Sequence, residues 1–230
     1  MKYTYLLIDF FSILVPLLFS FESKMKFYRK WNQLFPALLL TAFVFIVWDY
    51  FKTRNGVWTF SEVYTVGIRF FGLPVEEILF FFAIPYSCVF IYESVFYYVK
   101  QPVFGNKMVA VSGVVSVLAL AGSAFSRGQI YTFSVLFLLA IVLPIAVSLL
   151  SSDQYDKFLL TYLISLFPMA VVNGMLTALP VVTYNNAENM GVRVGSIPVE
   201  DFVYSFLLLI SNVLLYEMFR KWPKTSNALQ

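Results

Sequence analysis

Two pairs of carboxylic acids follow a Pro-Val dipeptide at separate places in the sequence. Residues 74–77 read Pro-Val-Glu-Glu, and residues 198–201 read Pro-Val-Glu-Asp. Proline at the first helical position, followed by acids in the first turn, is typical of a helix start. The carboxylates could serve only to complement the positive end of the helix dipole. The alternative is that they hold and transfer protons.

Helix geometry limits which of these acids can meet. Neighbouring residues on a helix point about 100° apart, so Glu76 and Glu77 cannot both face one small site. We expect Glu76 to pair with Glu200, with their carboxyls within roughly 8 Å, and Glu77 and Asp201 to support or exchange with them. Two carboxyl groups held together in apolar surroundings cannot both ionise, so one keeps its proton and can act as an acid.

Other polar residues lie where they could complete such a site. Asp49 and Asn173 each close the apolar stretch before one of the acidic phrases, and Asp9 lies within the first apolar stretch. Arg69 and Arg193 come five residues before the two prolines and could supply counter-charges. An arginine at such a place could equally be an interfacial anchor.

The composition is that of a membrane protein. The chain has 230 residues, of which 60% are hydrophobic and only 13% charged, whereas soluble domains are about half apolar and a quarter charged. The net charge of +3 is too small and too scattered to suggest a nucleic-acid partner. No histidine and a single cysteine, Cys88, leave none of the usual zinc ligand sets and no intramolecular disulfide. No metal site is therefore expected.

Seven apolar stretches are long enough to cross a bilayer at about 20 residues each. The first of them has no basic leader or small-residue cleavage site, so we interpret it as a span and not as a cleaved signal. The expected fold is all-α, a polytopic membrane protein with seven transmembrane helices at approximately 3–21, 34–51, 75–97, 107–125, 130–150, 157–178 and 198–220.

Basic residues in the connections predict the orientation in a bacterial inner membrane. They gather in the first connection, in the third connection and in the C-terminal tail, which should therefore face the cytoplasm, with the N-terminus outside. Both acidic phrases then lie at the outer side. Glu93 and Glu217, about 25 Å further along their helices, are expected to be solvated at the cytoplasmic rim. The basic residues are Lys24, Lys26, Arg29, Lys30, Lys100, Lys107, Arg220, Lys221 and Lys224.

An internal repeat accounts for the duplicated phrase. At an offset of 124 positions, Thr59 matches Thr183, the acidic phrases match each other, and Tyr92-Glu93 matches Tyr216-Glu217. Near the start of each copy the offset is read as 128, which aligns Tyr3 with Tyr131. We expect a first three-helix repeat at 1–100, a linker helix at 101–127 and a second repeat at 128–230. An odd linker gives a parallel repeat about an axis along the membrane normal.

These motifs resemble a known family. Two copies of Pro-Val-Glu-[Glu/Asp] open a transmembrane helix after a Gly-[Ile/Val]-Arg loop, and the preceding span ends in Asp or Asn. The combination resembles the membrane-embedded, flavin-independent lycopene cyclases of bacteria and fungi, which occur as two small subunits or as one fused chain. The resemblance covers nearly the whole chain and fits the fused form.

The resemblance implies an isomerisation without flavin, metal or other cofactor. A carboxylic acid protonates a terminal double bond of lycopene, the neighbouring alkene attacks the cation, and a base removes a proton to leave a β-ring. Glu76 and Glu200 would be the acid and base, supported by Glu77 and Asp201 and oriented by Asp49 and Asn173. The partners would be a lipophilic carotenoid, lycopene or γ-carotene, and membrane lipid.

Several alternatives stay open at this point. A small transporter could share the 3+1+3 plan, although helix centres such as Ile-Leu-Phe-Phe-Phe offer few polar pore-lining residues. Another isoprenoid-modifying membrane enzyme is a further alternative. The ring type, a C40 or C50 substrate, cyclisation at one end or two, and a homo-oligomer or an association with other carotenoid enzymes are not decided by these motifs.

Overall fold

Seven α-helices form the body of the protein in the computed structural model, which describes residues 1–105 and 107–226. Residue 106, within the expected linker, and residues 227–230, within the expected second repeat, lie outside the described part, as does the side chain of Lys224. The all-α class is therefore confirmed. The helices are α1 (Thr4–Phe19), α2 (Trp31–Arg54), α3 (Val75–Tyr98), α4 (Lys107–Phe125), α5 (Ile130–Leu149), α6 (Ser152–Ala178) and α7 (Val199–Ser226), with a 3-10 turn, Phe27–Lys30, before α2.

Six of the described helices, α2 to α7, are long and apolar enough to cross a membrane, so the chain is an integral membrane protein. The expected position of each of these spans is confirmed to within a few residues. The remaining helix, α1, has only 16 residues, which is about 24 Å of helix. It carries exposed apolar side chains such as Phe11, Val15 and Leu18. Its crossing of the membrane stays a prediction.

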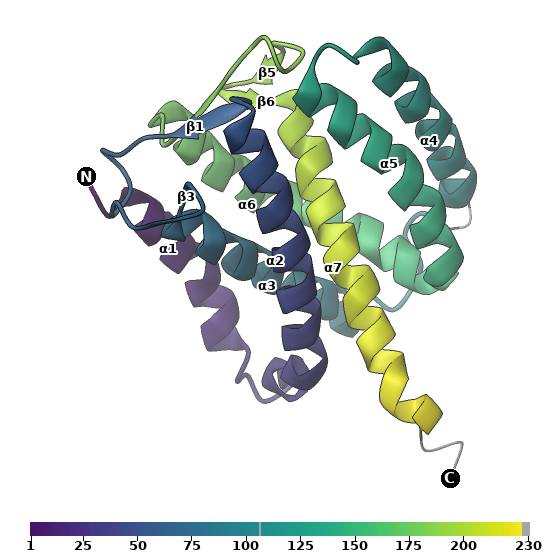
Figure 1. The fold of residues 1–230 in the computed structure, drawn as a ribbon. Helices are drawn as coiled ribbons and strands as arrows, with labels where there is room; N and C mark the ends of the chain where they lie inside the picture. The colour runs from purple at the N-terminus through teal and green to yellow at the C-terminus, as the bar shows by residue number, and fades with distance from the viewer. Residues whose placement is uncertain (106, 227–230) are drawn as a thin grey trace.

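Short strands cap one end of the helix bundle (Figure 1). β1 (Trp58–Phe60) pairs with β4 (Val182–Tyr184), and two small hairpins are formed by β2 (Arg69–Phe70) with β3 (Leu73–Pro74) and by β5 (Arg193–Val194) with β6 (Ile197–Pro198). Each hairpin leads directly into α3 or α7. Sequence analysis interpreted these segments as loops, because two or three residues are too few to show an alternating pattern.

Contacts between equivalent residues show how the two copies meet. β1 and β4 are antiparallel, and Thr59 lies opposite its own repeat equivalent, Thr183. At the far end of α3 and α7, the hydroxyl of Tyr92 donates to Glu217 at 3.1 Å, and its equivalent, Tyr216, donates to Glu93 at 2.7 Å. Such reciprocal contacts are those of a local two-fold axis between α3 and α7. The division into repeats at 1–100 and 128–230 with a linker helix stays a prediction.

The repeat register at the start of each copy differs from the expected one. The amide of Tyr5 donates to the carbonyl of Tyr64, and the amide of Tyr131 donates to that of Glu188, which is 124 positions after Tyr64. Tyr5, not Tyr3, is therefore the counterpart of Tyr131, and the offset there is 126 rather than 128. The matching Tyr-Thr pairs misled the sequence alignment: the hydroxyl of Thr4 donates to the carbonyl of Met1, whereas that of Thr132 donates to Glu200.

The helices pack so that α3 and α7 occupy the centre. α2 lies against α7 and α3, α1 lies against α3, α5 lies against α7, and α6 lies against α3. α4 packs chiefly on α5 at one edge, where Figure 1 shows the two side by side. Because α3 and α7 have the most protein around them, the acidic side chains on both helices are buried away from lipid and from water.

Glu93 on α3 and Glu217 on α7 are two such buried acids. The prediction that they are solvated at the cytoplasmic rim is wrong. Their side chains are only 2% and 1% exposed. Lys30 forms an ion pair with Glu93, and Arg220 reaches Glu217 at 2.8 Å. The amide of Gln154 also donates to Glu217, at 2.5 Å. The partners come from the 3-10 turn before α2, from α6 and from α7, which is why spacing along one helix could not reveal the burial.

This cluster predicts a loss of stability on truncation. Glu217→Ala removes the acceptor of Tyr92, Gln154 and Arg220 together, and leaving buried donors unpaired costs about 1–3 kcal/mol each. We expect a clearly lower unfolding temperature in detergent, followed by tryptophan fluorescence. Glu62→Ala is the matched control, because Glu62 is 86% exposed and exposed ion pairs contribute little. Equal melting of both variants would contradict a structural role for the cluster.

Candidate functional site

The first acid of each phrase holds the loop before its helix. Glu76 accepts a hydrogen bond from the amide of Val66 at 2.6 Å, and Glu200 accepts one from the amide of Met190 at 2.7 Å, ten residues upstream in both copies. Glu200 also accepts from the hydroxyl of Thr132 at 2.6 Å. The second oxygen of each acid has no hydrogen-bond partner among the described residues. Among the described residues no hydrogen bond joins Glu76 to Glu200, and the approach of their carboxyls within roughly 8 Å stays a prediction.

A cavity of about 620 Å³ lies beside the second acid of each phrase. Its walls come from α1, α3, α6 and α7, and residues of β1 and β4, including Trp58 and Val182, close it at the strand end. Glu77 and Asp201 both line it, whereas Glu76 and Glu200 do not. Of the four acids in the two phrases, the repeat-equivalent pair Glu77 and Asp201 lines the cavity, together with Asp49. Each of the pair is one residue further along its helix than Glu76 or Glu200.

Glu77 is held by a tyrosine and another acid. The hydroxyl of Tyr5 donates to Glu77 at 2.5 Å, and the carboxyl of Asp49 lies beside that of Glu77. Asp49 also accepts from Tyr204 at 2.8 Å, and both acids line the cavity. Two carboxyl groups this close in apolar surroundings are not both ionised, so the pair is suited to hold a proton at the cavity wall.

Asp201 has a different environment, because all its contacts are neutral donors. The hydroxyls of Tyr131 and Tyr184 donate at 2.6 and 2.9 Å, and the amide of Asn173 donates at 3.1 Å. Burial, and then the nearby Asp201 carboxylate, hold the pKa of Tyr184 well above its ordinary value, so this hydroxyl stays a donor. Three donors fix the orientation of Asp201 as a hydrogen-bond acceptor.

The remaining supporting residues separate into two groups. Asp49 and Asn173 lie in the site as expected, each next to the acid of its own copy. Asp9, one turn after Tyr5 on α1, is 3% exposed, and neither of its oxygens has a hydrogen-bond partner in the described part of the chain. It is a buried acid near the site that does not line the cavity.

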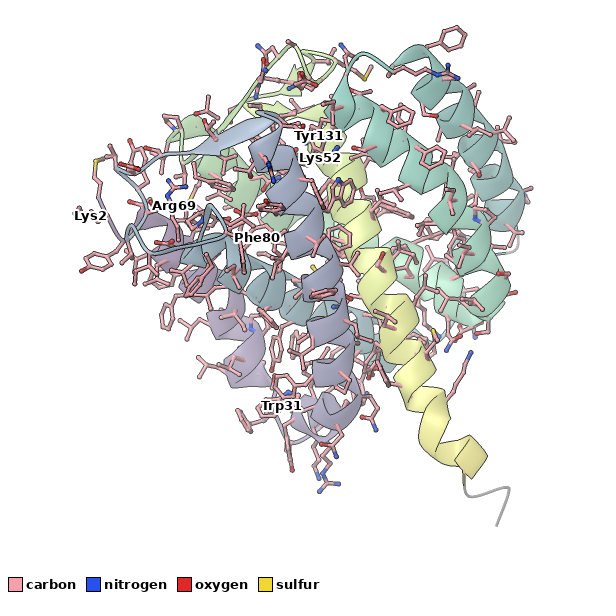
Figure 2. The ribbon with its side chains drawn as sticks, in the orientation of Figure 1. Lys2, Trp31, Lys52, Arg69, Phe80 and Tyr131 are labelled. Carbon is pink, nitrogen blue, oxygen red and sulfur yellow. The ribbon has the colours of Figure 1, made fainter. Side chains whose placement is uncertain are left out.

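The two arginines do not enter the site. Arg69 donates to the carbonyls of Gly72 and Phe60, and Arg193 donates to the carbonyl of Ser196 and to the side chain of Asn186. Figure 2 shows Arg69 in the loop region at the strand end. Within the described residues neither arginine forms an ion pair with Glu76, Glu77, Glu200 or Asp201. Both arginines bond a hairpin turn, and Arg193 also lies over the ring of Tyr184, 5.8 Å from its centre. Their role as counter-charges stays a prediction.

Aromatic rings surround the acids at the closed end of the cavity. The ring of Trp58 lies 5.2 Å from that of Tyr131 and 5.7 Å from that of Tyr184, centre to centre. Tyr204 lies 6.3 Å from Tyr131. Figure 2 places Tyr131 near the strand-bearing end, opposite to Trp31. Sequence analysis missed these residues, although the hydroxyl of Tyr204, three positions after Asp201, falls on the same helix face.

The rest of the cavity is apolar and reaches the outside of the bundle between α1 and α6. Leu7, Phe11 and Val15 of α1 and Phe167 and Val171 of α6 line it and are also exposed. In a membrane protein such an exposed apolar rim faces lipid. The cavity therefore opens sideways, toward acyl chains, and ends at the acids. No group of three or more potential metal-ligating side chains is found in the described residues.

The fold and the site together define an integral membrane protein with a lateral apolar cavity that ends in carboxyl groups. A family model described as "Lycopene cyclase" matches residues 2–95 and again residues 128–219. The chain belongs to the lycopene cyclase family and is a carotenoid cyclase. Its two matched segments agree with the two acidic phrases and leave the middle of the chain unmatched. No curated protein and no solved structure matches the chain.

Proposed function

We propose that the chain converts an acyclic end of lycopene into a β-type ring by acid catalysis, with no net redox change and no cofactor. The observation that supports this most is the position of Glu77, Asp49 and Asp201 at the closed end of an apolar cavity that opens to lipid. A carotenoid dissolved in the bilayer could enter sideways through the rim between α1 and α6. Its terminal double bond would then lie beside the carboxyl groups of the cavity wall.

The Glu77 and Asp49 pair supplies the proton in this proposal. In this scheme the pair holds one proton, because two carboxyl groups held together away from water cannot both ionise, and no water competes with the alkene for that proton. Protonation at the terminal double bond leaves a tertiary cation. The neighbouring double bond attacks it, which closes a six-membered ring and moves the positive charge into that ring.

The aromatic side chains around the acids and the carboxylate of Asp201 complete the proposed reaction. The faces of Trp58, Tyr131, Tyr184 and Tyr204 are placed to stabilise a cation, an interaction of about 0.5–2 kcal/mol for each suitable ring. Asp201, held by three donors, accepts a proton from the carbon next to the cation, and a new ring double bond forms. One proton is added and one is lost, so the product is an isomer of the substrate.

Glu76 and Glu200 act as positioning residues in this scheme. Each fixes the loop that leads into a strand hairpin and so sets the rotation of α3 or α7 about its axis. That rotation decides whether the next residue, Glu77 or Asp201, faces the cavity. We propose further that the strand end lies outside a bacterial inner membrane, because eight of the basic residues named above lie at the other end.

Replacing Glu77 tests the acid. Glu77→Gln keeps the volume and can still accept from Tyr5, but it cannot deliver a proton. We expect ring formation to fall by about 10²–10⁴-fold, the usual contribution of a general acid, with unchanged amounts of protein in the membrane. The measurement is cyclic product per folded protein after co-expression with lycopene synthesis, separated by chromatography. Orange pigment at the wild-type level would rule out Glu77 as the acid.

Glu76→Gln distinguishes the positioning role from a catalytic one. A glutamine oxygen can still accept from the amide of Val66, so the loop and the rotation of α3 are kept. We expect activity within about tenfold of the wild type, in contrast to Glu77→Gln. A loss as large as that of Glu77→Gln would return the acid role to Glu76.

Single-cysteine labelling tests the orientation. In a Cys88→Ser background, Ala187→Cys at the strand end and Ser23→Cys between α1 and α2 place one thiol on each side. A membrane-impermeant maleimide added to intact cells, with the outer membrane permeabilised, should label Ala187→Cys only. Ser23→Cys should react only after lysis. The reverse pattern would place the acids at the cytoplasmic leaflet.

A further inference from the structure

The position equivalent to the cavity in the other half of the molecule is filled with side chains. The cavity is lined by α6, whose counterpart in the first copy is α2. At the offset of 124, Val172 on the cavity wall corresponds to Trp48, and Met169 corresponds to Phe45. Small or flexible side chains thus line the cavity in one copy, and large rings occupy the matching place in the other.

These rings pack on one another between α2 and α7. The ring of Tyr204 lies 5.4 Å from Phe45 and 5.0 Å from Trp48, and Phe45 lies 5.4 Å from Trp48. The counterpart of Tyr204 is Phe80, which lines the cavity. In the described part of the chain the rings that contact Phe80 are those of Tyr5 on α1 and Phe81 on α3. The aromatic cluster therefore occupies the volume in which a second substrate end group would have to bind.

Further along α2, a lysine occupies another place that is equivalent to the cavity wall. Lys52 is the counterpart of Leu176, which lines the cavity. Its ammonium donates to the carbonyl of Ile130 at 2.9 Å and to the hydroxyl of Ser134 at 2.5 Å, so it ties α2 to α5. It also lies 5.8 Å from the ring of Trp48, and Figure 2 shows it on α2 near the strand end.

The carboxylic acids of the two copies are also arranged asymmetrically. Glu77 and Asp201 are repeat equivalents, yet both line the one cavity instead of one acid serving each half. A second, smaller cavity of about 260 Å³ lies among α4, α5, α6 and α7, and its described lining contains no carboxylic acid. The chemistry is therefore concentrated on one side of the local two-fold axis.

From this packing we infer that each chain has a single cyclisation pocket and holds one polyene end at a time. The inference rests on the proposed function. A product with two rings then requires that the one-ring carotenoid leave the pocket, turn round in the bilayer and enter again with its other end. The chain is thus a distributive enzyme, and the one-ring carotenoid is a free product that lipid dilutes.

One test transfers the filling residue into the pocket. Val172→Trp copies Trp48 onto α6, and overfilling a tight site typically costs tenfold or more in turnover, about 10–200-fold for small changes. We expect formation of the first and the second ring to fall together. Ile164→Trp is the matched control, because Ile164 is on the same helix, exposed and outside the cavity lining. First-ring formation that persists at about half the wild-type rate in Val172→Trp would reveal a second pocket.

A chase on the unaltered protein makes the same test without any mutation. Protein in liposomes first receives isotope-labelled lycopene until one-ring product is present, and then a large excess of unlabelled lycopene. We expect labelled two-ring product to stop accumulating, since released intermediate competes with the excess. An enzyme that forms only the one-ring product also fits, because it uses one end.

The outcomes separate the two proposals. Continued formation of labelled two-ring product after the chase would overturn the single-pocket inference and leave the proposed function intact. Absence of any cyclic product from well-folded protein would remove the proposed function itself. If the Val172→Trp protein does not accumulate in the membrane, Val172→Phe is used in its place. The chase on the unaltered protein is then the deciding measurement.

Discussion

The need to satisfy buried carboxyl groups governs this structure. Six acids lie on the two central helices, α3 and α7, where neither water nor lipid can solvate them, and an isolated charge in such surroundings is very costly. Each of the six has a polar partner: loop amides for Glu76 and Glu200, tyrosines for Glu77 and Asp201, and basic side chains for Glu93 and Glu217. The strands, the first turns of α1 and α5 and the ends of α2 and α6 are placed by these contacts.

The resulting site shows how a symmetric scaffold can carry an asymmetric reaction. The same helix position provides Glu77 in one copy and Asp201 in the other, but their neighbours differ. Asp49 places a second carboxyl beside Glu77, whereas its counterpart, Asn173, donates its amide to Asp201. A change from acid to amide at one position thus gives the two carboxyls different partners, which is the basis of the donor and acceptor roles proposed above.

Apolar runs and the repeat predicted most of the fold, because both depend on local composition and spacing. The helix boundaries and the gathering of Asp49 and Asn173 beside the acidic phrases followed from them. The sequence did not predict which of Glu76 and Glu77 faces the cavity. That depends on the rotation of α3 about its axis, which is fixed by the hydrogen bond from the amide of Val66 in the preceding loop. The burial of Glu93 was equally hidden, because its partner Tyr216 comes from the other copy and Lys30 from a different helix. Tyrosine hydroxyls at the site carry no sequence signal apart from spacing.

The partners of the buried acids also have a consequence for synthesis in the cell. Helix α7 leaves the ribosome 124 residues after α3, a delay of about 6–25 s at ordinary elongation rates. During that time Glu77 already has Tyr5 and Asp49, and Glu93 already has Lys30, all from the first half of the chain. The first half can therefore remain in the bilayer with these two acids already partnered. When α7 arrives, it adds the hydroxyls of Tyr204 and Tyr216 and the guanidinium of Arg220 as partners for Asp49 and Glu93.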